Sequence, residues 1–468
     1  MLLPDRGSLW ELAGAQGDLD QRFIADGCAR VTLATLGQQT GHEAAALFSG
    51  KSVLMSCSEQ LTVALGLIAL DGVARRIVLL PPDLDPKHLA YVAKTTDADV
   101  AISEKTQEDG YLIDGVRVVA CQPDRLAPLA GGKRIATEWI LFTSGTTGVP
   151  KMVVHTIDTL VGPTDQVRKL GNGAVWSTFY DIRRYGGLQI LLRSLVAGGS
   201  MVLSNSQETT AGFLTRAGAE NVSHISGTPS HWRRALMSAA AGNISPRYVR
   251  MSGEVADQAI IDALRSFYPQ ASVAHAFAST EAGLAFEVND GQAGFPAHFI
   301  TDERPGVTLR IREGSLQIRS IRTASGYLGG NASNLADAEG FIDTGDIVEL
   351  RNDRYHFVGR REGIINVGGF KVHPEEIEAV INRHPGVQMS MVRARSSPIT
   401  GAIVVADVVP RPSLTVDPGA QATLSKNLRT EILELCRSVL PAYKVPASIS
   451  VVPQLSVGAS GKLTRVRT

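Results

Sequence analysis

The chain has 468 residues, of which 44% are hydrophobic and 20% are charged, and its 46 Lys and Arg residues balance 46 Asp and Glu residues. A chain of this length holds roughly three folding units, and the composition is typical of a globular protein, which excludes a disordered or fibrous one. The lack of net charge excludes the general attraction that a protein coating a nucleic acid needs, but it leaves a local anion site open.

The longest apolar run extends from Leu61 to Leu70 and ends at Asp71. It is too short to cross a bilayer, so we expect no membrane span. The first residues lack a basic segment leading into an apolar one, which predicts a cytoplasmic protein without a secretory signal. The spacing of the cysteines fits neither a zinc pattern nor a disulfide framework. We expect reduced, mostly buried thiols at Cys28, Cys57, Cys121 and Cys436.

Between residues 77 and 279, short apolar runs alternate with segments of helical periodicity. Near-continuous apolar runs are typical of parallel strands that are covered on both faces. The alternation therefore predicts a mostly parallel, doubly wound α/β structure with ligands at the carboxyl ends of the strands. The predicted strands are residues 77–80, 100–102, 116–120, 139–142, 174–179, 201–204, 222–226, 248–252 and 272–277.

A helix is predicted over Ala256 to Tyr268, before the last of these strands. Its apolar residues share one face at helical spacing, which predicts that this face packs on the core. The residues of this face are Ile260, Ile261, Leu264 and Phe267.

After Glu281 the pattern changes to strands separated by Gly and Asn-Asp turns, which is typical of antiparallel structure. After Gly359 a helix (374–382), two strands (389–394 and 402–409), a second helix and a last strand predict a small α+β unit. The second helix carries a stripe of apolar residues that we expect to face the core of this unit. The stripe consists of Leu428, Ile432, Leu435, Cys436 and Val439.

The segment TSGTTGVPK, from Thr143 to Lys151, directly follows the predicted strand 139–142. Its hydroxyl residues and two glycines let backbone amides and hydroxyls surround a phosphate, and its lysine adds a cation. A polar loop without a ligand uses the same residue types. The segment lacks the Gly-Lys-Ser/Thr ending of a P-loop and the Gly-x-Ser-x-Gly turn of serine hydrolases.

TSGTTGVPK resembles the signature of the adenylate-forming superfamily, which comprises acyl-CoA synthetases, peptide-synthetase adenylation domains and luciferases. The resemblance implies a large N-terminal domain of doubly wound α/β subdomains plus a β-rich subdomain, followed by a small, mobile α+β C-terminal domain. We expect the large domain to comprise residues 1–361 and the small domain residues 362–468. The signature assigns ATP binding to Thr143, Ser144, Gly145, Thr146, Thr147, Gly148 and Lys151.

The segment HAFASTEAG, from His275 to Gly283, is similar to the family's YGxTE segment. This similarity implies that Phe277 packs on the adenine, that Thr280 touches the α-phosphate and that Glu281 holds Mg²⁺. A carboxylate beside a triphosphate needs a divalent cation between the two, and this Mg²⁺ would arrive with ATP.

Three further segments complete the implied nucleotide contacts. Gly253-Glu254 resembles the family's GGE turn along the adenine. GFIDTGDIVEL, from Gly340 to Leu350, resembles the RTGD segment, whose aspartate accepts both ribose hydroxyls. A carboxylate has the two acceptor oxygens that a vicinal diol requires, so this role is assigned to Asp346. By the same resemblance, Arg360 contacts the ribose.

The segment from Gly359 to Glu378 resembles the connection between the two domains of the family. Glu362 occupies the hinge position. Gly368 and Gly369 fit the loop that approaches the thiol channel after domain rotation, because glycine allows a close approach of backbone to a ligand. The sequence GGFKVHPEEIE is more similar to acyl-CoA synthetases than to peptide-synthetase domains.

Near the C-terminus, LSVGASGKLTR resembles the family's adenylation-lysine segment and makes Lys462 the principal catalytic candidate, together with Thr280 and Glu281. The implied reaction has two steps. A carboxylic acid and Mg-ATP give an acyl-adenylate, and a thiol then displaces AMP. The thiol would belong to CoA or to the phosphopantetheine of an acyl or peptidyl carrier protein.

Residues 177–192 occupy the place where the family begins to line its acyl pocket, and two interpretations of Asp181 stay open. Its carboxylate could bind a substrate amino group, as in peptide-synthetase domains, or it could form a structural ion pair with Arg183 or Arg184. An arginine in the pocket would in turn suit a polar or acidic acyl group. The predicted acyl-pocket residues are Tyr180, Asp181, Arg184 and Gly187.

The leading hypothesis is an ATP-dependent acid–thiol ligase that uses CoA. One alternative is an enzyme that loads an amino or aryl acid onto a carrier protein. The other is a degenerate nucleotide-binding regulator, and the presence of Lys462, Asp346 and Glu281 argues against it. The motifs carry the resemblance from Ile135 to Arg465, whereas the residues before Ile135 share with the family only an alternation of strands and helices.

Overall fold

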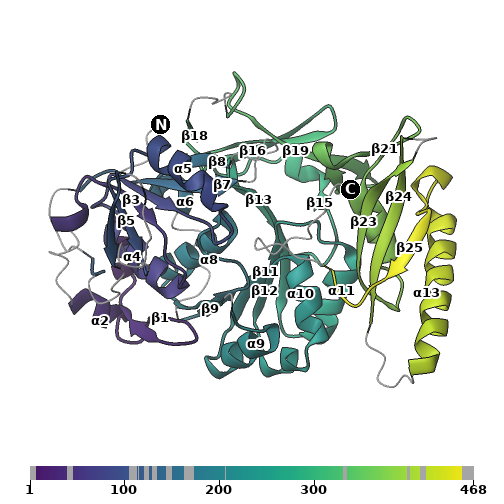
Figure 1. The fold of residues 1–468 in the computed structure, drawn as a ribbon, viewed down its shortest axis with the longest axis horizontal. Helices are drawn as coiled ribbons and strands as arrows, with labels where there is room; N and C mark the ends of the chain where they lie inside the picture. Colours follow the sequence, from purple (N-terminus) through teal and green to yellow (C-terminus); the bar gives the residue numbers. More distant parts are fainter. Residues whose placement is uncertain are drawn as a thin grey trace.

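The N-terminal part of the chain is built from two mostly parallel sheets on either side of a shared layer of helices (Figure 1). The structure is a computed structural model. It describes residues 7–38, 46–104, 113, 115–120, 126–128, 134–143, 150–162, 173–205, 207–329, 335–397, 401–411 and 418–455.

Sheet A contains the strands from the middle of the sequence together with two strands from near the N-terminus. Among the described strands, β13–β14 and β1–β2 are the antiparallel pairs of this sheet, and the other pairs are parallel. The spatial order is β14 (Gly283–Val288), β13 (Ser272–Ser279), β12 (Tyr248–Ser252), β11 (His224–Gly227), β9 (Val175–Thr178), β10 (Ser200–Val202), β1 (Phe23–Ala25) and β2 (Arg30–Thr32).

Sheet B is parallel from β6 to β7 and antiparallel at the other edge, where β8 and β18 are added. The spatial order is β18 (Gly326–Leu328), β8 (Lys151–His155), β7 (Glu138–Thr143), β4 (Arg76–Leu79), β3 (Ser52–Met55), β5 (Val100–Ser103) and β6 (Arg117–Ala120). Strands β1, β2 and β3 precede the first strand that the sequence predicted. They are three or four residues long.

The side chains of sheet B alternate between two cores, as a pleated strand requires. Val53 and Met55 of β3 pack in the layer shared with sheet A, whereas Leu54 packs in the outer core with Val92 of α5 (Leu89–Thr95). Burial on both faces explains why the strands appear in the sequence as near-continuous apolar runs.

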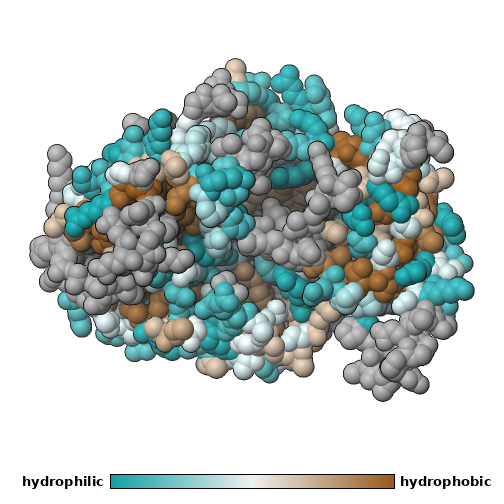
Figure 2. Space-filling model, viewed as in Figure 1, coloured by the Kyte–Doolittle hydropathy of each residue, from teal (hydrophilic) through white to brown (hydrophobic). Residues whose placement is uncertain are grey.

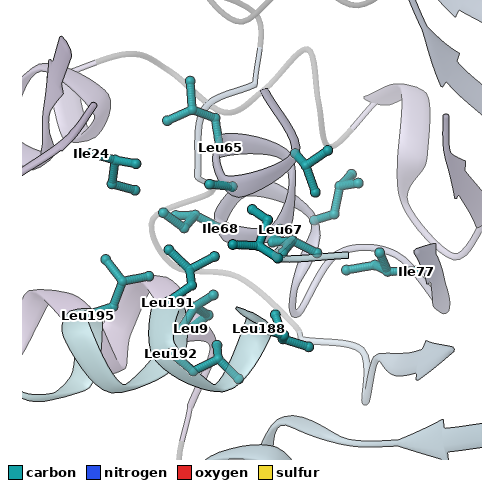
Figure 3. Close-up of a cluster of buried hydrophobic side chains, with 14 of the residues drawn as sticks. Leu9, Ile24, Leu65, Leu67, Ile68, Ile77, Leu188, Leu191, Leu192 and Leu195 are labelled. Atoms are coloured by element: carbon teal, nitrogen blue, oxygen red, sulfur yellow. The ribbon is translucent and has the colours of Figure 1, made fainter. Parts of the chain in front are cut away.

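The layer between the sheets contains α1 (Leu9–Gly14), α4 (Gln60–Leu70) and α8 (Tyr185–Val196). Figure 3 shows Leu67 and Ile68 of α4 opposite leucines of α8. Every residue of α4 is buried, so the apolar run Leu61–Leu70 is a core helix that needs no polar face. Among the helices of the described segments, none has both the length and the apolar character that crossing a bilayer demands.

The outer face of sheet A is covered by α9 (Thr210–Ala219), α10 (Pro229–Met237) and α11 (Gln258–Phe267). Three of the residues predicted to face the core from α11 are buried, but Phe267 is 46% exposed. That expectation was wrong because Phe267 is the last residue of the helix. The following residue, Tyr268, takes the buried position, and the two rings meet edge to face at 4.8 Å.

The β-rich part is sheet C, whose paired strands are antiparallel, as the sequence predicts. Its order is β15 (Phe295–Pro296), β20 (Arg354–Arg360), β19 (Ile342–Arg351), β17 (Ser315–Ser320) and β16 (Val307–Arg312). Shorter elements connect the main ones: α2 (Leu33–Gln38), α6 (Ile157–Val161) and the 3₁₀ turns η1 (Pro86–His88), η3 (Ala239–Asn243), η4 (Ala297–Ile300), η5 (Arg361–Gly363) and η6 (Ala442–Lys444).

The C-terminal unit, from β21 to β25, has a hydrophobic core of its own and lies at the right of Figure 1. Its last predicted core residue, Val439, is 50% exposed, because α13 ends there and Leu440 turns inward instead. The elements are β21 (Ile365–Val367), β22 (Phe370–Val372), α12 (Pro374–Ile381), β23 (Val387–Ser397), β24 (Gly401–Pro410), α13 (Pro418–Val439) and β25 (Ser448–Val451).

The predicted fold class is confirmed, with α/β layers followed by a smaller α+β unit. On the face shown in Figure 2, hydrophobic surface is divided into separate patches by hydrophilic side chains. Cys57 and Cys436 are buried, as expected for most of the thiols, but Cys28 is exposed. Cys121 lies outside the described residues.

Asp71, directly after α4, is a buried carboxyl group that joins three elements. Its Oδ2 accepts a hydrogen bond from the backbone N–H of Leu9 at 2.7 Å, and its Oδ1 accepts one from Trp139 Nε1 at 2.9 Å. Burial raises the pKa of Asp71 to about 6, although both hydrogen bonds act in the opposite direction. The carboxyl group therefore links α1 to β7, and the burial that this link requires raises its pKa.

We expect Asp71 to make folding less favourable as the pH rises from 3.8, its ordinary pKa, through about 6, because the folded state binds the proton more tightly. Asp71→Asn does not titrate, so its stability relative to wild type should rise by about 1 to 1.5 kcal/mol between about pH 5 and about pH 7.5. Urea unfolding at both pH values measures this difference. The exposed Asp20→Asn is the matched control, and parallel pH curves for Asp71→Asn and wild type would contradict the prediction.

Candidate active site

A cavity of about 330 Å³ lies between sheets A and C on one side and the C-terminal unit on the other. The carboxyl ends of β12 and β13 open into it, as expected for parallel strands. Helix α12 and strand β23 form the facing wall, with Asn382 and Met389 among the lining residues. Residues from widely separated motifs line this cavity together: Gly253, Glu254, Phe277, Asp346 and Arg360.

Asp346 and Arg360 stand opposite each other in the register of β19 and β20. The Nε of Arg360 donates a hydrogen bond to Oδ1 of Asp346 at 3.1 Å. The Asp346 carboxylate is the main reason why the pKa of Arg360 is raised, with smaller contributions from Glu281 and Glu362. Strand pairing therefore fixes a carboxylate and a guanidinium side by side at the cavity wall.

Phe277 gives the cavity a flat aromatic wall. Its ring is parallel to that of Phe357 on β20, at 4.9 Å and 7°, and is stacked with that of Phe286 on β14, at 5.8 Å. Rings held in such a row have little freedom to rotate. Offset stacking on a π face is the contact that a planar base can make with this wall.

The turn after β12 is held by a contact to α10. The Oε2 of Glu254 accepts a hydrogen bond from the backbone N–H of Ser230 at 3.0 Å, in the first turn of the helix. Gly253 has a φ of +85°, a conformation in which glycine is favoured. The turn therefore brings its backbone to the edge of the cavity without a side chain in the way.

Thr280 and Glu281 lie beside the residues that line the cavity, in the connection between β13 and β14. His155, at the end of β8, is hydrogen-bonded through Nε2 to the carbonyl of Thr280 at 2.7 Å. Because a carbonyl only accepts, Nε2 carries the proton and Nδ1 accepts from the hydroxyl of Thr159 at 2.9 Å. Burial lowers the pKa of His155 to about 4, so the ring is neutral at physiological pH. His155 thus ties sheet B to the Thr280 segment of sheet A.

The two ends of the predicted phosphate loop, Thr143 and Lys151, are direct partners in the β7–β8 pair. The Nζ of Lys151 lies 5.5 Å from the ring centre of Tyr327, and the hydroxyl of Tyr327 donates to Oε1 of Glu281 at 3.3 Å. Lys151 and Glu281 therefore contact the same aromatic side chain. The remaining predicted residues Ser144, Gly145, Thr146, Thr147, Gly148 and Lys462 lie outside the described residues.

The sequence motifs assign no role to His155 or Tyr327. A single histidine at the end of a strand gives no signal, and its partner Thr280 is 125 positions away in the sequence. Tyr327 stands in a Gly-Tyr-Leu segment with no chemical pattern beyond that of a short strand. Only the pairing of β18 with β8 shows that its ring lies near Lys151.

The four predicted acyl-pocket residues are not among those that line the cavity. Both carboxylate oxygens of Asp181 accept hydrogen bonds from Arg183, at 2.8 and 2.5 Å, so the structure contains the ion pair that one interpretation of Asp181 required. Arg184 is paired with Asp83 instead.

The other two residues of this group pack in the interior. Tyr180 is buried and donates through its hydroxyl to the carbonyl of Ser252 at 2.7 Å, and burial raises its pKa. Gly187 lets α8 approach the preceding turn, because a Cβ there would lie 2.3 Å from the carbonyl oxygen of Asp181. The assignment of all four residues to an acyl pocket stays a prediction.

The predicted hinge and thiol-channel residues lie on the connection to the C-terminal unit. Glu362 is exposed on η5, between β20 and β21. Gly368 and Gly369 form the tight turn of the β21–β22 hairpin with φ values of +57° and +93°. The backbone N–H of Gly369 donates to Oδ1 of Asn366 at 3.0 Å, which fixes the turn at the surface.

Comparison with known families matches most of the chain. Residues 13–328 match the AMP-binding enzyme family, and residues 376–462 match the AMP-binding enzyme C-terminal domain. The first match begins far before Ile135, where the resemblance in the sequence becomes specific. The N-terminal strands and helices therefore belong to the same family pattern as the motifs.

Individual relatives are distant. The 2-succinylbenzoate–CoA ligase of Salmonella typhimurium is 28% identical over 369 residues, which cover 75% of each chain. The p-hydroxybenzoic acid–AMP ligase of Mycobacterium tuberculosis is 26% identical over 475 residues, which cover 94% of this chain and 64% of the relative. The crystal structure of an anthranilate CoA ligase with anthranoyl-AMP superimposes with a TM-score of 0.79 at 17% identity, covering 98% of this chain and 96% of the other.

We expect His155→Phe to loosen the Thr280 segment, because the phenyl ring keeps most of the volume but neither accepts nor donates. The carbonyl of Thr280 and the hydroxyl of Thr159 would lose a partner, which costs about 1 to 3 kcal/mol in the free energy of unfolding. Hydrogen exchange should accelerate at residues 279–284 more than elsewhere. His298→Phe, at an exposed histidine, is the control, and unchanged exchange at residues 279–284 would contradict the role given to His155.

Proposed function

The chain belongs to the AMP-binding enzyme family, and we propose that it is an ATP-dependent ligase of a carboxylic acid and CoA. In the first step, a carboxylate oxygen attacks the α-phosphorus of Mg-ATP, and pyrophosphate leaves. In the second step, the sulfur of CoA attacks the acyl carbon, AMP leaves, and the thiol proton is released. Both steps join anions, so the enzyme acts by alignment and electrostatic stabilisation.

The observation that carries the proposal is the cavity between sheets A and C and the C-terminal unit. Its aromatic wall at Phe277 suits an adenine, and the turn at Gly253-Glu254 lies along the same space. Asp346 offers carboxylate oxygens for the ribose hydroxyls, with Arg360 beside it. These residues come from four separate segments, and the fold brings them to one cavity.

The phosphates would extend from this cavity toward the segment of Thr280 and the loop from Thr143 to Lys151. Glu281 is the proposed contact of the chain to Mg²⁺, which enters with ATP as part of the substrate. Carboxylate oxygens are the ligands that this hard cation prefers. Glu281 is close enough to the cavity to contribute to the raised pKa of Arg360, which supports its place beside the nucleotide.

We propose that residues 1–361 and 362–468 form two domains that rotate about Glu362. The separate core of the C-terminal unit, which begins at Ile365, supports this division. Contacts across the cavity include hydrogen bonds from Asn382 Nδ2 to Asp257 Oδ2 at 3.0 Å and from Gln388 Nε2 to the carbonyl of Arg233 at 2.7 Å. Polar contacts of this kind exchange readily for water, so they allow the domains to separate.

The experiment that tests the function is ATP–pyrophosphate exchange with a panel of aryl, fatty, hydroxy and amino acids. Aryl acids form the first group, because two relatives carry the names of 2-succinylbenzoate and p-hydroxybenzoic acid ligases. The acid that supports exchange is then supplied with CoA or with a phosphopantetheine carrier protein. We expect AMP and an acyl-CoA. Transfer to the carrier alone would favour a loading enzyme, and no exchange with any acid would contradict both.

We expect Lys462→Ala to slow formation of the acyl-adenylate by about 10²- to 10³-fold, because a lost transition-state donor costs about 3 to 4 kcal/mol. The same variant should convert pre-made acyl-adenylate and CoA at nearly the wild-type rate, since the lysine leaves the site before the second step. Rapid-quench assays of the two half-reactions measure both rates. Lys426→Ala, at an exposed lysine of α13, controls for loss of charge. A wild-type rate of adenylation in Lys462→Ala would disprove the assignment.

Gly369→Leu should have the opposite effect, because a bulky side chain on the hairpin turn obstructs the thiol but not the carboxylate. Transfer to CoA should fall at least about tenfold while ATP–pyrophosphate exchange stays within about twofold. Gly401→Leu is a matched control, because Gly401, the exposed first residue of β24, also has a positive φ, and no atom of the described residues lies within 4 Å of its Cβ position. Equal losses in both half-reactions would argue against two domain orientations.

A further inference from the structure

We propose that Tyr327 is a positioning residue that holds the carboxylate of Glu281 and the ammonium group of Lys151 in fixed relation to each other. The inference rests on the proposed function, because it concerns the two side chains that would contact Mg²⁺ and the phosphates of ATP. Tyr327 itself touches neither substrate in this proposal. It acts through the two charged residues on either side of it.

The hydroxyl of Tyr327 fixes one of these groups. It donates a hydrogen bond to Oε1 of Glu281 at 3.3 Å. A phenol hydroxyl is protonated at neutral pH, so Tyr327 can act as the donor in this bond. One carboxylate oxygen of Glu281 is thereby hydrogen-bonded to the protein, and the other is the one proposed to contact Mg²⁺.

The ring of Tyr327 fixes the other group. Tyr327 on β18 is the direct partner of Val153 on β8, and Lys151 is two residues away from Val153. Residues two apart on a strand share a face, so Lys151 and Tyr327 are diagonal neighbours. The Nζ of Lys151 lies 5.5 Å from the ring centre, within the range of a cation–π contact.

Backbone hydrogen bonds hold the main chain around these side chains. The carbonyl of Glu281 accepts from the N–H of Ala324 at 2.9 Å, and the N–H of Ser325 donates to the carbonyl of Val154 at 2.8 Å. The segments of Glu281 and Tyr327 are therefore joined before their side chains meet. What the backbone leaves undetermined is the rotation of the carboxylate, and this is the degree of freedom that the tyrosine hydroxyl removes.

The two contacts of Tyr327 can be separated by mutation. Tyr327→Phe removes the hydroxyl and keeps the ring, so it should release Glu281 but not Lys151. Tyr327→Leu removes both contacts. A carboxylate that rotates freely loses conformational entropy when it binds a cation. Free rotation of Glu281 should therefore lower the affinity for Mg²⁺.

The experiment is calorimetric binding of ATP at a series of Mg²⁺ concentrations, which does not depend on turnover. For Tyr327→Phe, the Mg²⁺ concentration that gives half of the maximal ATP affinity should rise about three- to tenfold, as expected for one lost hydrogen bond. ATP affinity without Mg²⁺ should stay within about twofold of wild type. For Tyr327→Leu, ATP affinity without Mg²⁺ should also fall about threefold or more, because Lys151 loses its neighbour.

Two controls distinguish positioning from a general structural effect. Tyr355→Phe removes the hydroxyl of another half-buried strand tyrosine, whose ring stacks on Phe295 at 5.4 Å, and should leave the Mg²⁺ dependence unchanged. In a Glu281→Gln background, Tyr327→Phe should add no further shift, because the two residues act as one unit.

A wild-type Mg²⁺ dependence in Tyr327→Phe would overturn this inference and leave the proposed function intact. The same shift in Tyr355→Phe, or a full additional shift in the Glu281→Gln background, would also overturn it. Failure of the wild-type protein to bind Mg-ATP at all would overturn the proposed function and this inference together.

Discussion

The hydrogen bond from His155 Nε2 to the carbonyl of Thr280 connects the two large sheets beside the candidate phosphate-binding residues. Sheets A and B share an apolar helix layer that resists separation but does not by itself fix how the sheet edges meet. The directional contact between the buried imidazole of His155 and the carbonyl of Thr280 contributes to that constraint, since an unpaired polar group in the interior is unfavourable. Backbone hydrogen bonds from Ala324 to the carbonyl of Glu281 and from Ser325 to the carbonyl of Val154 hold the neighbouring chain in the same region.

The C-terminal unit is attached differently. Where the sheets are joined by a large apolar layer, this unit meets the large domain through side chains such as Asn382 and Gln388, which hydrogen-bond to Asp257 and Arg233. The first joint is the apolar contact between the two sheets, and the second is the polar contact with the C-terminal unit. A two-step reaction on a single nucleotide requires this difference. In the proposed mechanism, the first joint would keep the nucleotide contacts rigid and the second would let the C-terminal unit move.

The sequence predicts the layers well, because strands covered on both faces and helices with one apolar stripe have distinct periodicities. It fails at helix ends, where Phe267 and Val439 keep the periodicity but leave the core. The resemblance of the motifs predicted residues that line the cavity, but not the residues that position them. Asp181 shows why, since local sequence allows either a ligand contact or an ion pair, and only the folded structure shows that the ion pair with Arg183 is formed.

The pairing of β1 with β10 has a consequence for biosynthesis. Ile24 and Ala25 have Met201 and Val202 as their parallel neighbours, and the antiparallel partner β2 covers only the other edge. A nascent chain therefore exposes one edge of this hairpin until residue 202 has emerged from the ribosome. The helix α4 is also incompletely covered until then, because its core includes residues of α8 and β10. Such long-range closure slows folding and leaves apolar surface available to chaperones during translation.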